Sequence, residues 1–261
     1  MNELKGEPLW VLGPSCKLEQ YKDFIKDKIP RENTLTIAHT FFYLKKLWDY
    51  QPMYFTWIDP HQTFCFNELY NQIDGLLNDT SHYITFPFNQ DRETFLKYHT
   101  SSGYVNKKGF SQYRDFLKNI KQHNFLHEIY CDAMPIRSKS DDIAKKLFED
   151  PNFRFNILKE TIIGTQLHQL ENWITRLVYP LAHHYGIKDV FVLGFDDQKQ
   201  RFYQKGKTGR YNPIHYQFRC LKKWQEWEPY HGVKMQNIQL DSPLSKFMKT
   251  ISPEESILLL K

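Results

Sequence analysis

The chain has 261 residues, enough for one sizeable α/β domain and too few for two complete enzymes. Hydrophobic residues make up 41% of the sequence and charged residues 25%, so wholesale disorder is excluded. The net charge of +5 is a small surplus, which suits an anionic substrate or an acidic membrane surface and proves neither.

Cysteine spacing and apolar runs bear on the cellular compartment. The 4 cysteines lie far apart without a C-x-x-C motif, whereas a secreted domain built on disulfides is denser in cysteine. Residues 1–5 lead into no apolar run, and no stretch approaches the ~20 apolar residues that cross a bilayer. We expect a cytoplasmic protein, either free or peripheral at the inner membrane.

Strands and helices alternate in the first part of the chain. An apolar run at 9–12 predicts a buried strand, and Gly13-Pro14-Ser15 predicts a tight turn after it. Apolar residues three and four apart predict a helix over 18–28. The same reasoning predicts further strands at 34–38, 53–58 and 83–86, and helices at 41–50 and 69–77.

An insertion at about 89–160 matches no simple pattern, although 125–130 reads as a strand; the alternation resumes after it. A long periodic helix is predicted from Gly164, with Pro180 as a kink and Gly186 in the left-handed position past its end. The apolar run 189–194 is typical of a parallel strand covered on both faces, and a helix at 216–227 and a strand at 233–238 follow.

This alternation predicts one α/β domain over residues 1–261, with a doubly wound, mostly parallel, Rossmann-like sheet. Gly206 and Gly209 indicate a small mobile lid at 197–214. Ligands of such sheets bind beyond the carboxyl ends of the strands. The turns that follow the strands are therefore the candidate site.

These turns carry polar groups, each with a functional and a structural interpretation. Gly13-Pro14-Ser15 offers backbone N–H groups and a hydroxyl to a phosphate, or is a plain turn whose serine caps a helix. His39 and Asp59 could each reach a ligand. Alternatively, His39 is a buried histidine with a structural role, and Asp59 begins a turn. Asp196 follows the strand at 189–194, where a carboxylate either binds a metal, the less favoured interpretation, or simply ends the strand.

The segment 199–223 is basic and rich in tyrosine. It contains 8 lysines and arginines and no acidic residue. Tyr203 and Tyr211 could bind phosphate, and His215 carries an imidazole, the side chain best suited to general-base work near neutral pH. A solvated basic loop and a surface for single-stranded nucleic acid are the alternatives.

Together these strand ends resemble the bacterial lipooligosaccharide sialyltransferases of glycosyltransferase family 42, and related proteins that share a G-P-S opening. Three segments carry the resemblance, over roughly half of the chain. They are Trp10-Val11-Leu12-Gly13-Pro14-Ser15-Cys16-Lys17, the strand ends at 37–40 and 57–60, and 164–196 with the tyrosine-containing loop, the histidine and Ser242-Pro243-Leu244-Ser245 that follow it.

The resemblance implies a GT-A-like variant of the fold and a metal-independent, inverting transfer from CMP-sialic acid to a glycan or glycolipid hydroxyl, without a cofactor. It implies His215 as the base and Tyr203 as a hydrogen-bond donor to the departing phosphate, with Tyr211 as a second donor chosen by proximity. The family often forms tetramers, so a homo-oligomer is one expectation, and nucleic acid is not a favoured partner. The implied donor-binding positions are Gly13, Pro14, Ser15, His39, Asp59, Gly164, Thr165 and Asp196.

The chain departs from the family pattern at Leu12, His39 and Asp59, where family members usually have asparagine, and at Ile162-Ile163, where they have Thr-Ser. An aspartate beside an anionic donor is unfavourable unless it is paired. Two alternatives therefore stay open. One is a Mg²⁺-dependent, pyrophosphokinase-like nucleotide enzyme on the same fold, for which Asp59 and Asp196 are suited, and the other is a non-catalytic protein that binds nucleic acid or another anion.

Overall fold

A computed structural model describes residues 6–57, 82–85, 125–128, 178–195, 221–222 and 225–259. The chain divides into two compact units: Met1–Leu35 with Tyr130–Lys261 form unit 1, and Thr36–Ile129 form unit 2. Strand β2, Thr34–Ile37, begins in unit 1 and ends in unit 2. The predicted lid at 197–214 and all of the 89–160 insertion except 125–128 lie outside the described residues, so the single-domain arrangement stays a prediction.

The sheet of unit 1 is parallel and doubly wound. Its strands β1 (Leu9–Leu12), β6 (Asp189–Leu193) and β7 (Lys234–Asn237) follow β2 in the order β2-β1-β6-β7. The pairs β1–β6 and β6–β7 are both parallel. The chain passes from β1 to β2 on one side and returns to β6 on the other, which confirms the predicted fold class.

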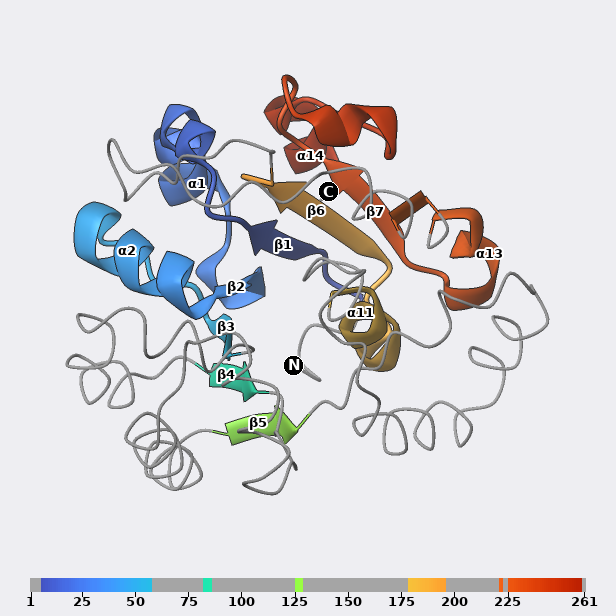
Figure 1. Cartoon of the computed structure of the whole chain (residues 1–261), viewed down its shortest axis with the longest axis horizontal. Helices are drawn as coiled ribbons and strands as arrows, with labels where there is room; N and C mark the ends of the chain where they lie inside the picture. The colour runs from blue at the N-terminus through green and yellow to red at the C-terminus, as the bar shows by residue number, and fades with distance from the viewer. Residues whose placement is uncertain are drawn as a thin grey trace, which may run out of the picture. The chain divides into compact units, whose positions relative to one another are not determined.

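The apolar runs predicted as buried strands pack on both faces. All four residues of β1 are buried, as are the last four of β6. Trp10 of β1 lies with its ring centroid 4.8 Å from Phe191 of β6 and 6.0 Å from Phe24 of α1. Figure 1 shows α1 (Lys22–Lys28) and α14 (Pro253–Leu258) on one side of these strands and α11 (Tyr179–Tyr185) on the other.

The helix predicted over 18–28 is α-helical only in its second half. Cys16–Tyr21 form the 3₁₀ helix η2, and α1 continues from Lys22. At the end of α11, Gly186 has the predicted left-handed backbone, with φ 68°. Pro180 stands in the first turn of α11, where a missing N–H costs no hydrogen bond. The remaining short helices of unit 1 are η3 (Arg31–Asn33), α13 (Glu228–His231) and η6 (Pro243–Lys246).

Unit 2 repeats the alternation. Helix α2 (Ala38–Trp48) follows β2 and leads to β3 (Tyr54–Trp57), and Phe41 packs on Phe55 with ring centroids 4.5 Å apart. Strand β3 pairs parallel with β4 (His82–Thr85), which pairs parallel with β5 (Phe125–Glu128). The strands predicted at 53–58, 83–86 and 125–130 are therefore confirmed.

Beyond β7 the chain returns to the strand it has just left. The N–H of Asn237 donates to Lys249 O at 2.9 Å, and the N–H of Ile251 donates to Asn237 O at 3.0 Å. Asn237 and Thr250 thereby form an isolated parallel bridge. Asn237 uses both of its backbone groups in this bridge.

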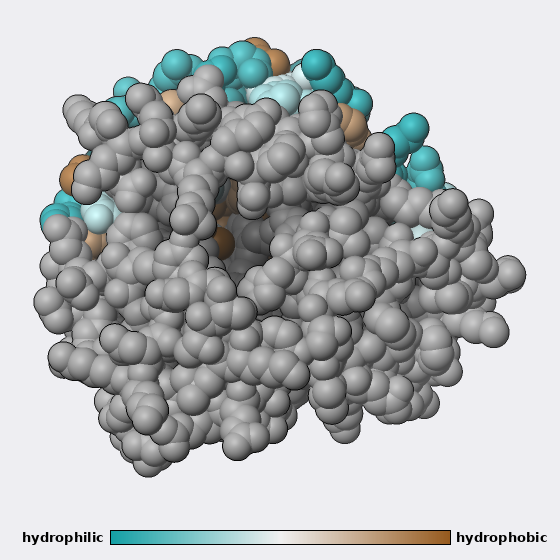
Figure 2. All heavy atoms as spheres, in the orientation of Figure 1, coloured by the Kyte–Doolittle hydropathy of each residue, from teal (hydrophilic) through white to brown (hydrophobic). Residues whose placement is uncertain are grey.

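The surface gives no sign of a membrane-spanning element within the described ranges, because none of their helices is both long and apolar enough to cross a bilayer. On the face drawn in Figure 2, the described residues that are visible are mostly hydrophilic, with a few hydrophobic side chains among them. The exposed large hydrophobic residues include Leu240 and Leu258, which are 60% and 65% exposed.

Replacing Trp10 with alanine should destabilise unit 1 by about 3–5 kcal/mol, because a fully buried indole that contacts two aromatic rings would leave a cavity. Urea unfolding followed by circular dichroism measures the change. Leu258→Ala is the matched control and should stay within about 0.5 kcal/mol of the wild type. A loss below about 1 kcal/mol for Trp10→Ala would contradict the packing described here.

Candidate functional site

The carboxyl ends of β1 and β6 mark the switch point of unit 1. The two strands are neighbours, and the chain that leaves β1 moves toward β2, whereas the chain that leaves β6 moves toward β7. The crevice of a doubly wound sheet opens where such connections diverge. Gly13-Pro14-Ser15 follows β1 here, and Gly194-Phe195 follows β6.

The two turns at the switch point touch through their backbones. The N–H of Gly13 donates to Leu193 O at 2.8 Å. A Cβ on Gly13 would lie only 2.3 Å from Gly194 O and 2.9 Å from the Phe195 ring. Gly194 has φ +80°, a conformation that side-chain-bearing residues rarely adopt. Both positions therefore require glycine, Gly13 for space and Gly194 for its backbone.

Three hydrogen bonds hold Ser15 inside the protein. Its N–H donates to Gly194 O at 3.0 Å, and its carbonyl accepts from Leu18 N–H at 3.0 Å. Its Oγ accepts from Lys17 N–H at 3.1 Å, which makes Ser15 the cap of η2. The side chain is buried, with 3% of the residue exposed. The capping interpretation of Ser15 is thus present in the structure, and its role toward a ligand stays a prediction.

These bonds use the backbone donors that the G-P-S turn was expected to offer to a phosphate. The N–H of Gly13 and the N–H of Ser15 both donate to carbonyl groups of the β6 end, and Pro14 has no N–H. The N–H of Lys17 is bound to Ser15 Oγ. An anion beside this turn would therefore not be met by these three N–H groups.

The segment after β7 is fastened to the same place. Ile238 N–H donates to Val192 O at 3.0 Å, and Ser242 Oγ donates to Phe195 O at 2.9 Å. Ser242 also caps η6, because its Oγ accepts from Leu244 N–H at 3.2 Å. The ends of β1, β6 and β7 thus form one hydrogen-bonded group.

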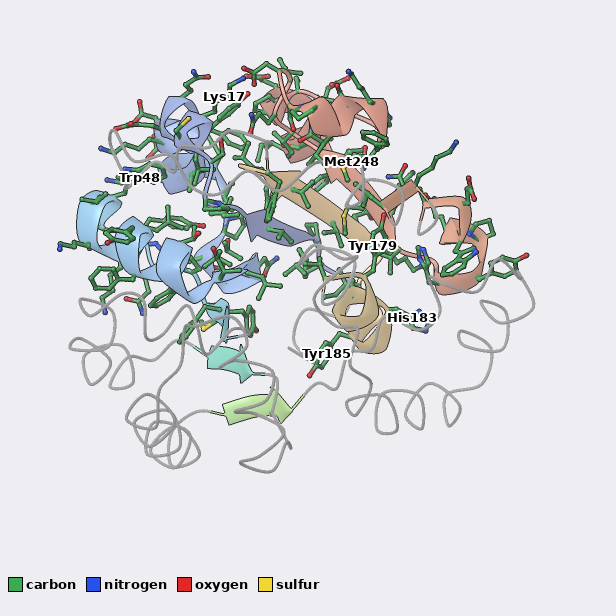
Figure 3. The ribbon with its side chains drawn as sticks, in the orientation of Figure 1. Lys17, Trp48, Tyr179, His183, Tyr185 and Met248 are labelled. Atoms are coloured by element: carbon green, nitrogen blue, oxygen red, sulfur yellow. The ribbon has the colours of Figure 1, made fainter. Side chains whose placement is uncertain are left out.

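Lys17 and Asp241 form an ion pair across this group. The Lys17 side chain is 19% exposed and that of Asp241 is 52% exposed, and Gln239 Nε2 donates to Asp241 Oδ1 at 3.2 Å. The hydrogen bond from the Lys17 ammonium holds the pKa of Asp241 below its ordinary value. Figure 3 shows Lys17 between the blue helical segment that contains α1 and the red C-terminal segment. No local sequence pattern indicates this pair, because its members are 224 positions apart.

The predicted site residues fall into three groups. Gly13, Pro14 and Ser15 lie together at the switch point. His39 is the second residue of α2, directly after β2, as its predicted place at a strand end requires, and only its backbone is described. The others lie outside the described residues and stay predictions: Asp59, Gly164, Thr165, Asp196, Tyr203, Tyr211 and His215.

Metal ligands can be judged only for part of the chain. Within the described ranges, no three His, Cys, Asp or Glu side chains are grouped so that they could hold a metal ion. The carboxylates considered above for such a role, Asp59 and Asp196, are not among those residues.

The chain was compared with known proteins. No family model matches it, and no curated protein matches it. Among solved structures, the sialyltransferase CstII from Campylobacter jejuni with CMP-3FNeuAc is similar at 14% identity and a TM-score of 0.46, over 93% of this chain and 85% of that one. The sialyltransferase CST-II in complex with a trisaccharide acceptor and CMP is similar at 14% identity and a TM-score of 0.47, over 94% of this chain and 86% of that one. The α-2,3-sialyltransferase Cst-I from Campylobacter jejuni is similar at 11% identity and a TM-score of 0.46, over 95% of this chain and 81% of that one. Likeness at this level establishes neither a family nor an activity for the chain.

Alanine at Gly13 should destabilise the fold by about 3 kcal/mol or more, because the new Cβ would overlap a backbone carbonyl that cannot swing away. Gly232→Ala is the matched control: Gly232 has φ +69° but open space around it, so only backbone strain of about 1–2 kcal/mol is expected. Thermal unfolding of both variants measures the difference. Equal losses would show that the two turns do not touch as described.

Acid should remove the stability that the Lys17–Asp241 pair provides. A carboxyl whose folded pKa is depressed stabilises the fold above its ordinary pKa of 3.8, and that stability is lost as the pH falls through the folded pKa. We expect Asp241→Asn to lower the free energy of unfolding by up to about 1 kcal/mol at neutral pH. The difference from the wild type should shrink below pH 3.8 in a series of urea unfolding curves. A difference that is the same in acid would exclude the ion pair as its cause.

Proposed function

We propose that the chain is a glycosyltransferase that moves a sugar, sialic acid from CMP-sialic acid, to a hydroxyl of a glycan or glycolipid, with inversion and without a metal or cofactor. One observation carries the proposal: the G-P-S turn, part of one of the three segments that resemble the sialyltransferase family, stands at the carboxyl end of β1 beside the switch point of a doubly wound sheet. A nucleotide donor is expected to bind there.

The chemistry assigned to the chain is a single displacement at the anomeric carbon. The acceptor oxygen forms a bond to that carbon while the bond to the CMP phosphate breaks, and the transition state is cationic at the sugar. His215 takes the acceptor's proton on an imidazole nitrogen. Tyr203 and Tyr211 donate hydrogen bonds to the phosphate as its charge develops, the task that a metal ion performs for diphosphate leaving groups. The products are the extended glycan and CMP.

The remaining predicted residues would hold the donor. They are Gly13, Pro14, Ser15, His39, Asp59, Gly164, Thr165 and Asp196. Since the backbone donors of the G-P-S turn are engaged, this turn supports the donor by shape more than by hydrogen bonds to its phosphate. We further propose that the protein works in the cytoplasm, with a glycolipid acceptor drawing it to the inner membrane, and that copies of the chain associate.

The proposal predicts that His215→Ala abolishes sugar transfer and leaves CMP binding largely intact, because the base acts on the acceptor and not on the nucleotide. Transfer from CMP-sialic acid to an oligosaccharide acceptor is measured by release of CMP. His183→Ala is the matched control, since His183 Nδ1 is hydrogen-bonded to His231 O and has no assigned part in the reaction. Transfer at the normal rate by His215→Ala would show that the assigned base is wrong.

The same assay separates the proposal from the magnesium-dependent alternative. Transfer that persists in EDTA supports the metal-independent mechanism. Absence of sugar transfer together with nucleotide turnover that EDTA abolishes and Mg²⁺ restores would favour the pyrophosphokinase-like enzyme, with Asp59 and Asp196 as ligands. Binding that ignores CMP and falls steeply with salt would instead favour a non-catalytic anion-binding protein.

A further inference from the structure

Three backbone N–H groups of the described turn after β1, those of Gly13, Ser15 and Lys17, are not available to a phosphate. All three donate within the protein, and the Ser15 side chain is buried. If a nucleotide phosphate lies beside this turn, a cationic side chain next to the turn would stabilise its charge together with the tyrosine hydroxyls assigned above.

Lys17 meets that requirement by its position. Its backbone is fixed two residues beyond Ser15 through the hydrogen bond to Ser15 Oγ. Its side chain is partly exposed, and its ammonium already binds a carboxylate oxygen, that of Asp241. A phosphate oxygen offers an ammonium the same kind of partner with more negative charge.

Asp241 is well placed to be a stand-in for such an anion. It is held by a hydrogen bond from Gln239 Nε2 to its Oδ1 at 3.2 Å. Its carboxylate is half exposed, so water screens the attraction to Lys17, and exchange for a more highly charged partner costs little. When Lys17 turns to a ligand, Asp241 can return to solvent without leaving a buried charge.

We propose that Lys17 binds the phosphate of the nucleotide donor and that Asp241 is a competing internal anion, which occupies the Lys17 ammonium until the phosphate replaces it. This rests on the proposed function, because it assumes that a nucleotide phosphate reaches the crevice of unit 1.

The proposal predicts opposite effects of the two partners on nucleotide affinity. Lys17→Met should weaken CMP binding by about tenfold or more, because a charge-assisted hydrogen bond is lost. Asp241→Asn should strengthen it by up to about fivefold, because the competing anion is gone. Lys26→Met, which removes an equal charge from an exposed position of α1, is the control and should bind as the wild type does. Isothermal titration calorimetry of the full chain with CMP measures all four proteins.

A purely structural ion pair gives a different pattern. A lower melting temperature of Asp241→Asn is expected in either case, but with a purely structural pair neither variant would bind CMP more tightly than the wild type does. That result would overturn the proposal, as would Lys17→Met binding with wild-type affinity. Should Lys17→Met fail to fold, Asp241→Asn still decides, because only tighter binding by that variant agrees with the proposal.

Parallel titrations with UMP, GMP and AMP separate this inference from the donor assignment. Another monophosphate that binds in place of CMP with the same opposite effects would support the role of Lys17 and overturn the CMP-linked donor. CMP that binds without the opposite effects would overturn the role of Lys17 and leave the donor standing. A wild type that binds none of the four would overturn the role of Lys17, while the transferase would still be judged by transfer from CMP-sialic acid.

Discussion

The backbone contact between Gly13 and Gly194 is the constraint on which the candidate site depends. It joins the turn after β1 to the turn after β6 so closely that no side chain fits at the first position and few fit at the second. The hydrogen bond from Ser15 N–H to Gly194 O and that from Gly13 N–H to Leu193 O extend the contact on either side. Strands that are far apart in sequence thereby end in one rigid corner, and Ser242 ties the segment after β7 to it.

A corner built in this way changes which atoms can recognise a ligand. The N–H groups of Gly13 and Ser15 donate to carbonyl groups at the end of β6 and so hold the strand ends together. The Ser15 side chain caps η2. Recognition then falls to side chains at the rim, of which Lys17 and Asp241 are one pair. The proposed roles of Tyr203, Tyr211 and His215 agree with this, since they too assign charge stabilisation to side chains.

The sequence predicts elements well where local physics decides them. The apolar runs of β1 and β6 are buried strands, and Gly186 ends α11 in the left-handed conformation. The sequence predicts local structure and contacts poorly where these depend on segments far away in the chain. The spacing of Leu18, Tyr21, Phe24 and Ile25 fits an α-helix, yet Cys16–Tyr21 form the 3₁₀ helix η2, which Ser15 caps while it is bonded to the distant Gly194. The Lys17–Asp241 pair has no local pattern at all, because a salt bridge between distant segments leaves none in either. The switch point itself was predictable, whereas the engagement of its N–H groups was not.

The bridge between Asn237 and Thr250 has a consequence for association. β7 is the last strand in the order of unit 1, so its outer edge would be the natural place for a second sheet to add on. Lys249 and Ile251 occupy the N–H and C=O of Asn237 on that side. A neighbouring molecule therefore finds the carboxyl end of this edge already paired. If copies of the chain assemble, helix and loop surfaces are better suited to the interface than continuation of the sheet past Asn237.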